Sequence, residues 1–332
     1  MYRLGLDIGA TKTMMAIMDN VGHSLWRTKL LSADVLQGGV TPADALAGNI
    51  LGFCQQAGID FSVIDGIGIG FPGIMDRASQ AITSCPNLPI LDGLCLGPDL
   101  AERLGVPVLV ENDVNLIALG EHFKGRGKGI PDLACVFVGS GIGCGLILRG
   151  SLYSGADGAA GEFGHTVVEP EGHLCTCGNR GCLEMYCSGK ALALQAHSIV
   201  SQAGNKSSGQ AAGSPVRWVD AELVIRAARA GHPAALEAMR KAFHYLGLGI
   251  ANLTNILNPR LVILGGGIVA GWPAGIDIVR ETVQARARAV VRDRVVIDTP
   301  ALGEEAGLVG AFVLVGGKDN SAVEKVPHPG KF

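Results

Sequence analysis

The sequence L-G-L-D-I-G-A-T-K-T-M-M-A-I-M-D, residues 4–19, places a tight glycine-containing turn between two short apolar runs. Residues 4–8 predict a buried strand that enters the turn, and residues 14–18 predict a second strand that leaves it. Dinucleotide-binding and P-loop folds run from such a turn directly into a helix, so this order argues against both. The stretch therefore predicts a strand–turn–strand unit.

A similar unit recurs at residues 134–148, where glycine-rich residues 139–145 separate one apolar run from the run at 146–148. Two glycine hairpins indicate two related halves. Residues 66–73 and 106–113 predict further strands that end in glycine-rich or polar loops, where active sites are common. Helical spacing of apolar residues covers 219–258 and ends before Pro259, and a strand at 261–264 then meets three glycines.

The composition is that of an ordinary globular protein. With 332 residues, of which 48% are hydrophobic, the chain can bury a core large enough for two domains or one large one. A formal net charge of -3 argues against nucleic acid or an anionic membrane surface as a partner. Asp7 comes too early for a signal peptide, and no apolar run approaches the roughly 18 to 20 residues of a membrane span. The expected location is the cytoplasm.

Three of the nine cysteines lie within eight positions, at Cys175, Cys177 and Cys182. This spacing favours reduced thiols that bind a metal over a disulfide framework. With His165 they offer four ligands to tetrahedral Zn²⁺, which would leave no open position, so the site would be structural. Nearby His173 and Cys187 are alternative ligands. The remaining cysteines are interpreted as small buried residues: Cys54, Cys85, Cys95, Cys135 and Cys144.

The first glycine turn could bind phosphate. Exposed backbone amides there, with Thr11, Lys12 and Thr13, could contact phosphate oxygens, although an ordinary hairpin explains the turn equally well. The second hairpin and the three glycines at 265–267 strengthen the nucleotide hypothesis, because a nucleotide needs a phosphate cradle and small residues beside its base.

The residues Glu111-Asn112-Asp113 follow a predicted strand. A buried Asp113 could accept the proton of a hydroxyl group during phosphoryl transfer, while Asn112 fixes the acceptor by hydrogen bonding. The alternative is an Asx turn or a helix cap.

The order of these motifs resembles the ROK family, which comprises sugar kinases, open reading frames and repressors. The resemblance covers about residues 3–315 and includes Glu162-x-Gly-His165 and the cysteine cluster that ends in Glu184. It implies an α/β, actin-like and hexokinase-like (ribonuclease H-like) ATPase fold with two domains and an interdomain cleft. We expect a small domain at 1–113 plus about 309–325 and a large domain with the zinc site at 114–308. Residues 203–214 are expected to form a mobile loop, and 316–332 a poorly ordered tail.

The resemblance implies a role for each matching residue. Asp113 would be the general base, and zinc would hold His165 and Glu184 in sugar-binding geometry. It also favours the four zinc ligands His165, Cys175, Cys177 and Cys182 over His173 and Cys187. The implied sugar contacts are Gly73, Asn87, Asn112, Glu162, His165 and Glu184. The implied nucleotide contacts are Asp7, Gly9, Thr11, Lys12, Thr13, Gly139, Ser140, Gly141, Gly265, Gly266 and Gly267.

The implied reaction is transfer of the ATP γ-phosphoryl group to O6 of an aldohexose, with Mg²⁺ on the phosphates and a homodimer as the assembly. The stretch 86–89 lacks the tryptophan that commonly follows in glucokinase-like members and, with 187–189, resembles the D-allose kinase branch, whereas 111–113 resembles glucokinases. An N-acetylmannosamine or other hexose kinase is the alternative. A transcriptional regulator is disfavoured because Asp7 leaves no room for a helix-turn-helix before the turn. Retention of Asp113 argues against a non-catalytic sugar sensor.

Overall fold

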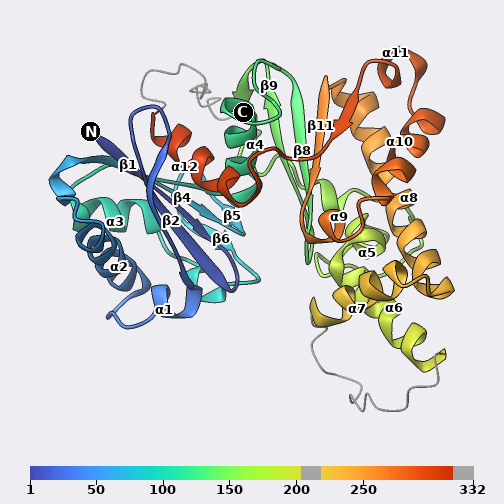
Figure 1. Cartoon of the computed structure of the whole chain (residues 1–332), viewed down its shortest axis with the longest axis horizontal. Helices are drawn as coiled ribbons and strands as arrows, with labels where there is room; N and C mark the ends of the chain where they lie inside the picture. The colour runs from blue at the N-terminus through green and yellow to red at the C-terminus, as the bar shows by residue number, and fades with distance from the viewer. Residues whose placement is uncertain (203–217, 317–332) are drawn as a thin grey trace, which may run out of the picture. The chain divides into compact units, whose positions relative to one another are not determined.

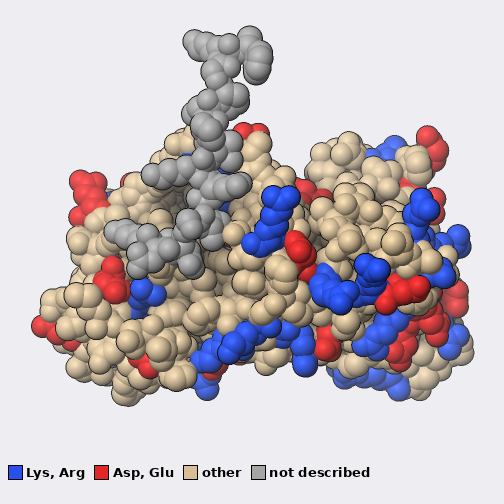
Figure 2. Space-filling view, turned by 90° about the horizontal axis from the view of Figure 1, so that it is seen from above, with Lys and Arg blue, Asp and Glu red and all other residues tan. Residues whose placement is uncertain are grey.

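The computed structural model describes residues 1–202 and 218–316, which form two compact units. Unit 1 comprises Met1–Leu133, Gly145–Gly161 and the chain from Pro300 onward, and unit 2 comprises Ala134–Cys144 and Glu162–Thr299. The elements of both are labelled in Figure 1. No helix within the described ranges is long and apolar enough to cross a membrane. On the face shown in Figure 2, basic and acidic side chains are interspersed.

The first sheet has the strand order β3-β2-β1-β4-β7 and lies in unit 1. The predicted hairpin at residues 4–19 is confirmed, since β1 pairs antiparallel with β2, whereas β1, β4 and β7 run parallel. A two-stranded sheet, β5-β6, follows β4 along the chain. The strands are β1 Tyr2–Ile8, β2 Lys12–Met18, β3 Ser24–Leu31, β4 Ile64–Phe71, β5 Ile74–Met75, β6 Ile82–Ser84 and β7 Val108–Asn112.

Successive side chains of a strand point to opposite faces of the sheet, and apolar residues lie on both faces here. Helices therefore pack on the sheet. One face joins α2 and α3 in a core that includes Leu4, Leu6 and Ile50. Helix α12 packs on β1 and β4, where a Cβ on Gly68 would lie only 2.1 Å from the Ala311 carbonyl oxygen (Figure 1). The helices of unit 1 are α1 Ser32–Leu36, α2 Pro42–Gln56, α3 Leu96–Leu104, α4 Asp113–Phe123 and α12 Ala306–Gly316, with short 3-10 turns at Phe61–Val63, Pro89–Leu91 and Gly303–Glu305.

The second sheet has the order β10-β9-β8-β11-β12. Its first hairpin was predicted to resume at Leu146, but the strand begins at Ile142. Small residues explain the difference, since a Cβ on Gly145 would lie 2.6 Å from the Val114 carbonyl oxygen, so the extended backbone packs where a side chain could not. The strands are β8 Leu133–Val138, β9 Ile142–Leu148, β10 Ser151–Leu152, β11 Leu261–Gly265 and β12 Val296–Asp298.

The predicted helical region at 219–258 forms two helices, α7 and α8. The break follows from Gly231, whose φ of 81° favours glycine, and from Pro233 at the first position of α8. The helices of unit 2 are α5 Glu184–Cys187, α6 Gly189–Gln202, α7 Trp218–Arg229, α8 Pro233–Leu257, α9 Gly267–Gly271, α10 Gly275–Arg286 and α11 Ala289–Arg292, with a 3-10 turn at Phe163–His165.

The compact units differ from the domain boundaries that the sequence predicted. Helix α4, expected to open the large domain, lies in unit 1 because it packs against α12, and residues 145–161 also lie there. The expected mobile loop at 203–214 lies outside the described residues, as does the expected tail after Gly316.

Glycines set the spacing of α4 and α12, which gives a stability prediction. A Cβ on Gly310 would lie 1.8 Å from the Leu116 carbonyl oxygen, so the helices must separate in Gly310→Ala. We expect this variant to lose about 3 kcal/mol of stability, seen as a lower thermal midpoint. Gly48→Ala in α2 is the matched control, because its methyl group meets nothing within 4 Å, and we expect a gain of up to about 1 kcal/mol. Equal midpoints for the two variants would contradict the packing.

Candidate active site

Two carboxylates meet at one edge of the first sheet. Asp7 lies near the end of β1, and Asp113 begins α4 directly after β7. Gly70 on β4 lies between them, since a Cβ there would be 3.6 Å from both Asp7 Oδ1 and Asp113 Cα. Loss of hydration raises the pKa of Asp7 to about 6. Loss of hydration, with repulsion from Asp7, raises the pKa of Asp113 to about 7. Asp113 therefore changes protonation near neutral pH, as a general base should.

Asn112 serves as the N-cap of α4. Its Oδ1 accepts the backbone N–H of Val114 at 2.9 Å and of Asn115 at 3.2 Å, and its Nδ2 donates to the Gly73 carbonyl oxygen at 3.1 Å. The helix-cap alternative is thus realised. The cap also directs the amide towards Gly73, a predicted sugar contact, so the two roles are compatible.

The predicted sugar loop follows the β5–β6 hairpin. Leu88 N–H donates to the Cys85 carbonyl oxygen at 2.9 Å, which closes a turn with Asn87 exposed at its tip. Gly73 lies beside this loop, because a Cβ there would be 2.4 Å from the Ser84 carbonyl oxygen. Position 73 therefore has no room for a side chain, and Asn87 is free to meet a ligand.

The first glycine turn, predicted to bind phosphate, is held by its own hydrogen bonds. Gly9 N–H donates to the Lys12 carbonyl oxygen at 3.0 Å, and Ser32 Oγ donates to the Gly9 carbonyl oxygen at 2.6 Å. Thr13, predicted to contact nucleotide, is buried with its hydroxyl 3.0 Å from Ser32 Oγ. Thr11 and Lys12 are exposed and remain available to phosphate, while Thr13 stabilises the turn.

The second glycine hairpin binds Glu184, which the family resemblance assigned to the sugar. Glu184 is buried, and its Oε2 accepts the Ile142 N–H at 3.2 Å. A Cβ on Gly141 would lie 2.4 Å from that oxygen, so only glycine allows this approach. Lys190 Nζ lies 3.7 Å from Glu184 Oε1. The hairpin at 139–141 and Glu184 therefore form one packed group within unit 2.

The three glycines after β11 permit close packing against β8. Gly266 has a φ of 91°, and a Cβ there would lie 2.4 Å from the Val138 carbonyl oxygen. A Cβ on Gly265 would meet the Phe137 ring at 2.5 Å, and Gly267 begins α9. Close packing against β8 is therefore enough to explain the small residues at 265–267. A nucleotide could also use the surface that they leave.

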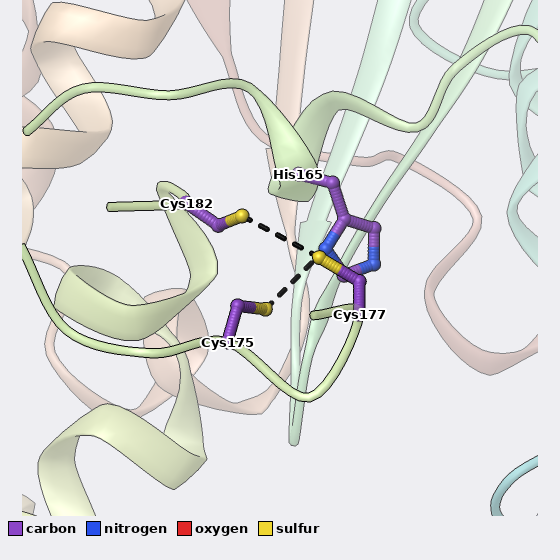
Figure 3. Close-up of side chains that lie close together, drawn as sticks. All are labelled: His165, Cys175, Cys177 and Cys182. Carbon is purple, nitrogen blue, oxygen red and sulfur yellow. Dashed lines mark hydrogen bonds between the residues drawn. The ribbon is translucent and has the colours of Figure 1, made fainter. Parts of the chain in front are cut away.

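The four predicted metal ligands come together in unit 2 (Figure 3). The ligand atoms of His165, Cys175, Cys177 and Cys182 all lie within 4.8 Å of one another. Cys175 Sγ lies 3.6 Å from His165 Nδ1, and Cys177 Sγ lies 3.6 Å from Cys182 Sγ. The soft donors suit Zn²⁺. Burial and the neighbouring thiols raise the pKa of Cys182 to about 12, whereas the Asn179 backbone N–H lowers the pKa of Cys177.

The alternative ligands lie outside this group. Cys187 Sγ donates to the Leu183 carbonyl oxygen at 3.4 Å, and the His173 ring packs on Tyr186 with centroids 5.4 Å apart. The expectation that the remaining cysteines are buried is met by four of the five, while Cys95 is partly exposed.

His165 has a different neighbour for each ring nitrogen. Nδ1 faces the thiols, whereas Nε2 lies 3.8 Å from Glu162 Oε2. The side chain of Glu162 is 48% exposed and that of His165 is 32% exposed, so both can reach a ligand. Binding of a metal through Nδ1 would fix the ring with Nε2 directed outward.

Two residues that are linked to Glu111, next to the Asn112–Asp113 junction, were missed by sequence reasoning. Arg77 donates a hydrogen bond to Glu111 and another to Ser154. No motif marks either residue, and they lie 34 and 43 positions from Glu111 in the chain.

Comparison with known proteins places these features in a family. The model of the ROK family matches residues 3–318. A glucokinase of Halalkalibacterium halodurans is 32% identical over 325 residues, which cover 96% of each chain. A ROK family glucokinase from Streptomyces griseus, solved with glucose and AMPPNP, has a TM-score of 0.76 at 32% identity, covering 95% of this chain and 99% of that one. A ROK family transcriptional regulator, a homologue of the E. coli MLC protein, has a TM-score of 0.80 at 25% identity and is covered over 78% of its length. The chain therefore belongs to the ROK family and has its actin-like and hexokinase-like two-domain α/β fold.

Proposed function

We propose that this sugar kinase transfers the γ-phosphoryl group of ATP to the 6-hydroxyl of an aldohexose, with D-glucose or D-allose as the preferred acceptor. The carrying observation is Asp113, a carboxylate whose pKa is raised to about 7 at the start of α4 beside Asn112 and Asp7. The likeness to glucokinases, one of them solved with glucose and AMPPNP, supports the reaction class.

Asp113 acts on the acceptor hydroxyl. As the sugar oxygen bonds to the γ-phosphorus and the bond to the β-phosphate oxygen breaks, the hydroxyl proton passes to Asp113 and ADP leaves. Asn112 and Asn87 would orient the sugar, and Thr11 with Lys12 would contact phosphate oxygens. Mg²⁺ bound with ATP would neutralise the negative charge of the phosphates. Asp7 would help to hold this ion.

The thiol–imidazole cluster has a structural role in this proposal. His165, Cys175, Cys177 and Cys182 would hold Zn²⁺ with all four positions filled, so no water is activated there. The metal would keep His165 Nε2 directed towards Glu162 and a sugar hydroxyl. Glu184, at the start of α5 and bound to the neighbouring hairpin, would face the sugar.

The test is ADP release with glucose, allose, mannose, fructose, N-acetylglucosamine and N-acetylmannosamine, with the product's phosphate position read by ³¹P NMR. We expect turnover with glucose or allose and a 6-phosphate product. Turnover with N-acetylmannosamine alone would replace the proposed acceptor. Sugar binding without turnover on any sugar would contradict the kinase proposal in favour of a sensor or regulator.

The pH dependence follows from the two raised pKa values. Because Asp113 must be ionised to accept a proton, kcat/KM for the sugar should rise with pH and level off above about pH 7. Asp7→Asn removes a negative charge that raises the pKa of Asp113, so the rising limb should move to lower pH even if the maximum falls. Asp34→Asn, at an exposed position of α1, should leave the limb in place. An unshifted limb in Asp7→Asn would contradict the coupling.

A further inference from the structure

Arg77 links three segments of unit 1. It lies in the turn between β5 and β6, and its Nη2 donates to Glu111 Oε2 at 2.8 Å and to Ser154 Oγ at 2.5 Å. Ser154 follows β10, and both Ser154 and Glu111 are buried. A guanidinium group thus reaches a buried carboxylate that lies one residue before Asn112.

The other oxygen of that carboxylate faces the proposed catalytic junction. Glu111 Oε1 accepts the backbone N–H of Asn112 at 3.0 Å and the side-chain Nδ2 of Asn115 at 3.0 Å. Asn115 is itself buried in the first turn of α4. Glu111 therefore fixes the peptide that leads into Asn112 and Asp113 on one side and binds Arg77 on the other.

Packing holds the Arg77 side chain in this position. Gly158 has a φ of 87°, and a Cβ there would lie 2.9 Å from Arg77 Cγ. The turn that carries Arg77 is joined to the junction a second time, because Asn112 Nδ2 donates to the Gly73 carbonyl oxygen just before β5. The side chain of Arg77 is 36% exposed and that of Glu111 10% exposed, so the carboxylate is largely shielded from water, and Arg77 is its ion-pair partner among the residues that the structure describes.

Loss of one partner from such a pair is costly. Removing the cation leaves a buried carboxylate without charge compensation, and the structure around it must move or take up water. A shift of about 1 Å in a group that acts on a reacting atom can reduce the rate by about 100-fold. The residues that would move here are Asn112 and Asp113.

We propose that Arg77, acting through Glu111, is a positioning residue for Asn112 and Asp113. The proposal rests on the hexose kinase function proposed above. Arg77 itself touches no reacting atom in this assignment. It sets the direction of the Asn112 peptide and hence the place of the Asp113 carboxylate.

The kinetic test uses Arg77→Met, Arg77→Lys and the double variant Arg77→Met with Glu111→Gln, assayed where circular dichroism shows each to be folded. We expect Arg77→Met to lower kcat by about 30-fold to 100-fold, with KM for ATP changed less than about threefold. Arg77→Lys should recover part of the rate, since it returns a cation. The double variant should lose less than Arg77→Met, because the amide that replaces the Glu111 side chain leaves no unpaired carboxylate.

A matched control separates this role from ion pairing in general. Arg103→Met breaks the Arg103–Asp44 pair, which has a 2.7 Å contact and side chains 32% and 37% exposed in the same unit, and should keep kcat within about twofold. Folded Arg77→Met with wild-type kcat, or an equal loss in the double variant, would overturn the proposal.

Hydrogen exchange gives a readout that does not depend on turnover. In Arg77→Met, amides of residues 112–116 should exchange faster than in the wild type, and in Arg103→Met they should not. Unchanged exchange in Arg77→Met would overturn the positioning role. Absence of wild-type turnover on every sugar would instead count against the proposed function, while the exchange comparison still decides on Arg77.

Discussion

Asp113→Asn is expected to lower kcat for sugar phosphorylation by about 1000-fold while sugar affinity stays within about threefold. An amide of the same shape keeps the hydrogen bond that Asp113 Oδ1 accepts from Val114 N–H at 2.9 Å, but it cannot take the hydroxyl proton. Turnover is measured as ADP release, and sugar affinity by isothermal titration calorimetry. Asp34→Asn on α1 is the matched change at an exposed position and should retain full turnover.

Stability measurements show whether the variant is folded. Asp113 has a folded pKa near 7, above its ordinary value of 3.8, so its ionisation favours the unfolded chain and costs stability as the pH rises from about 4 to about 7. Each pKa unit corresponds to about 1.4 kcal/mol. Asp113→Asn should therefore melt above the wild type at pH 8 and close to it at pH 4. A stable variant with unchanged turnover would remove Asp113 as the base.

Local patterns were sufficient to predict the hairpin at residues 4–19 and the cysteine cluster, whereas the choice of His165 over His173 and Cys187 came from the family resemblance. Short apolar runs on both sides of a glycine turn favour antiparallel pairing over a short distance, and the cysteine spacing brings Cys175 and Cys177 close without any long-range packing. The strand at Ile142 was placed four residues late, because its glycines read as a turn until the packing partner Val114 is known.

Contacts between distant segments could not be predicted in the same way. The bond between Glu184 and the Ile142 N–H joins positions 42 apart, and the Arg77–Glu111 pair joins positions 34 apart. The inward hydroxyl of Thr13 depends on Ser32, which follows a whole strand later. In each case the local motif could at most mark the polar residue as a candidate. The partner that determines its role lies far away in the sequence and is brought close only by the fold.

Cys177→Ser is expected to lose bound zinc and to weaken sugar affinity by about 10-fold to 100-fold. The wild type should carry one zinc per chain. Loss of one thiolate from a closed four-ligand site removes most of the binding energy for the metal. The ring of His165 then keeps only the 3.6 Å contact of its Nδ1 with Cys175 Sγ in place of a metal bond. Metal content is measured by inductively coupled plasma mass spectrometry on the purified chain, and sugar affinity by calorimetry without ATP. Cys95→Ser, at a partly exposed cysteine outside the cluster, should change neither quantity.

The size of the affinity loss tests which sugar contact the metal controls. Glu184 is also held by the Ile142 N–H, and the Leu183 N–H donates to the Thr166 carbonyl oxygen at 2.9 Å, so this side of the loop keeps its own restraints without metal. Without metal, the His165 ring keeps only long side-chain contacts, 3.8 Å to Glu162 Oε2 and 3.6 Å to Cys175 Sγ, so His165 and Glu162 should lose their orientation first. His165→Gln in the zinc-free Cys177→Ser background should then cost little further affinity. A large additional loss, or full sugar affinity in zinc-free Cys177→Ser, would show that the sugar contacts do not depend on the metal.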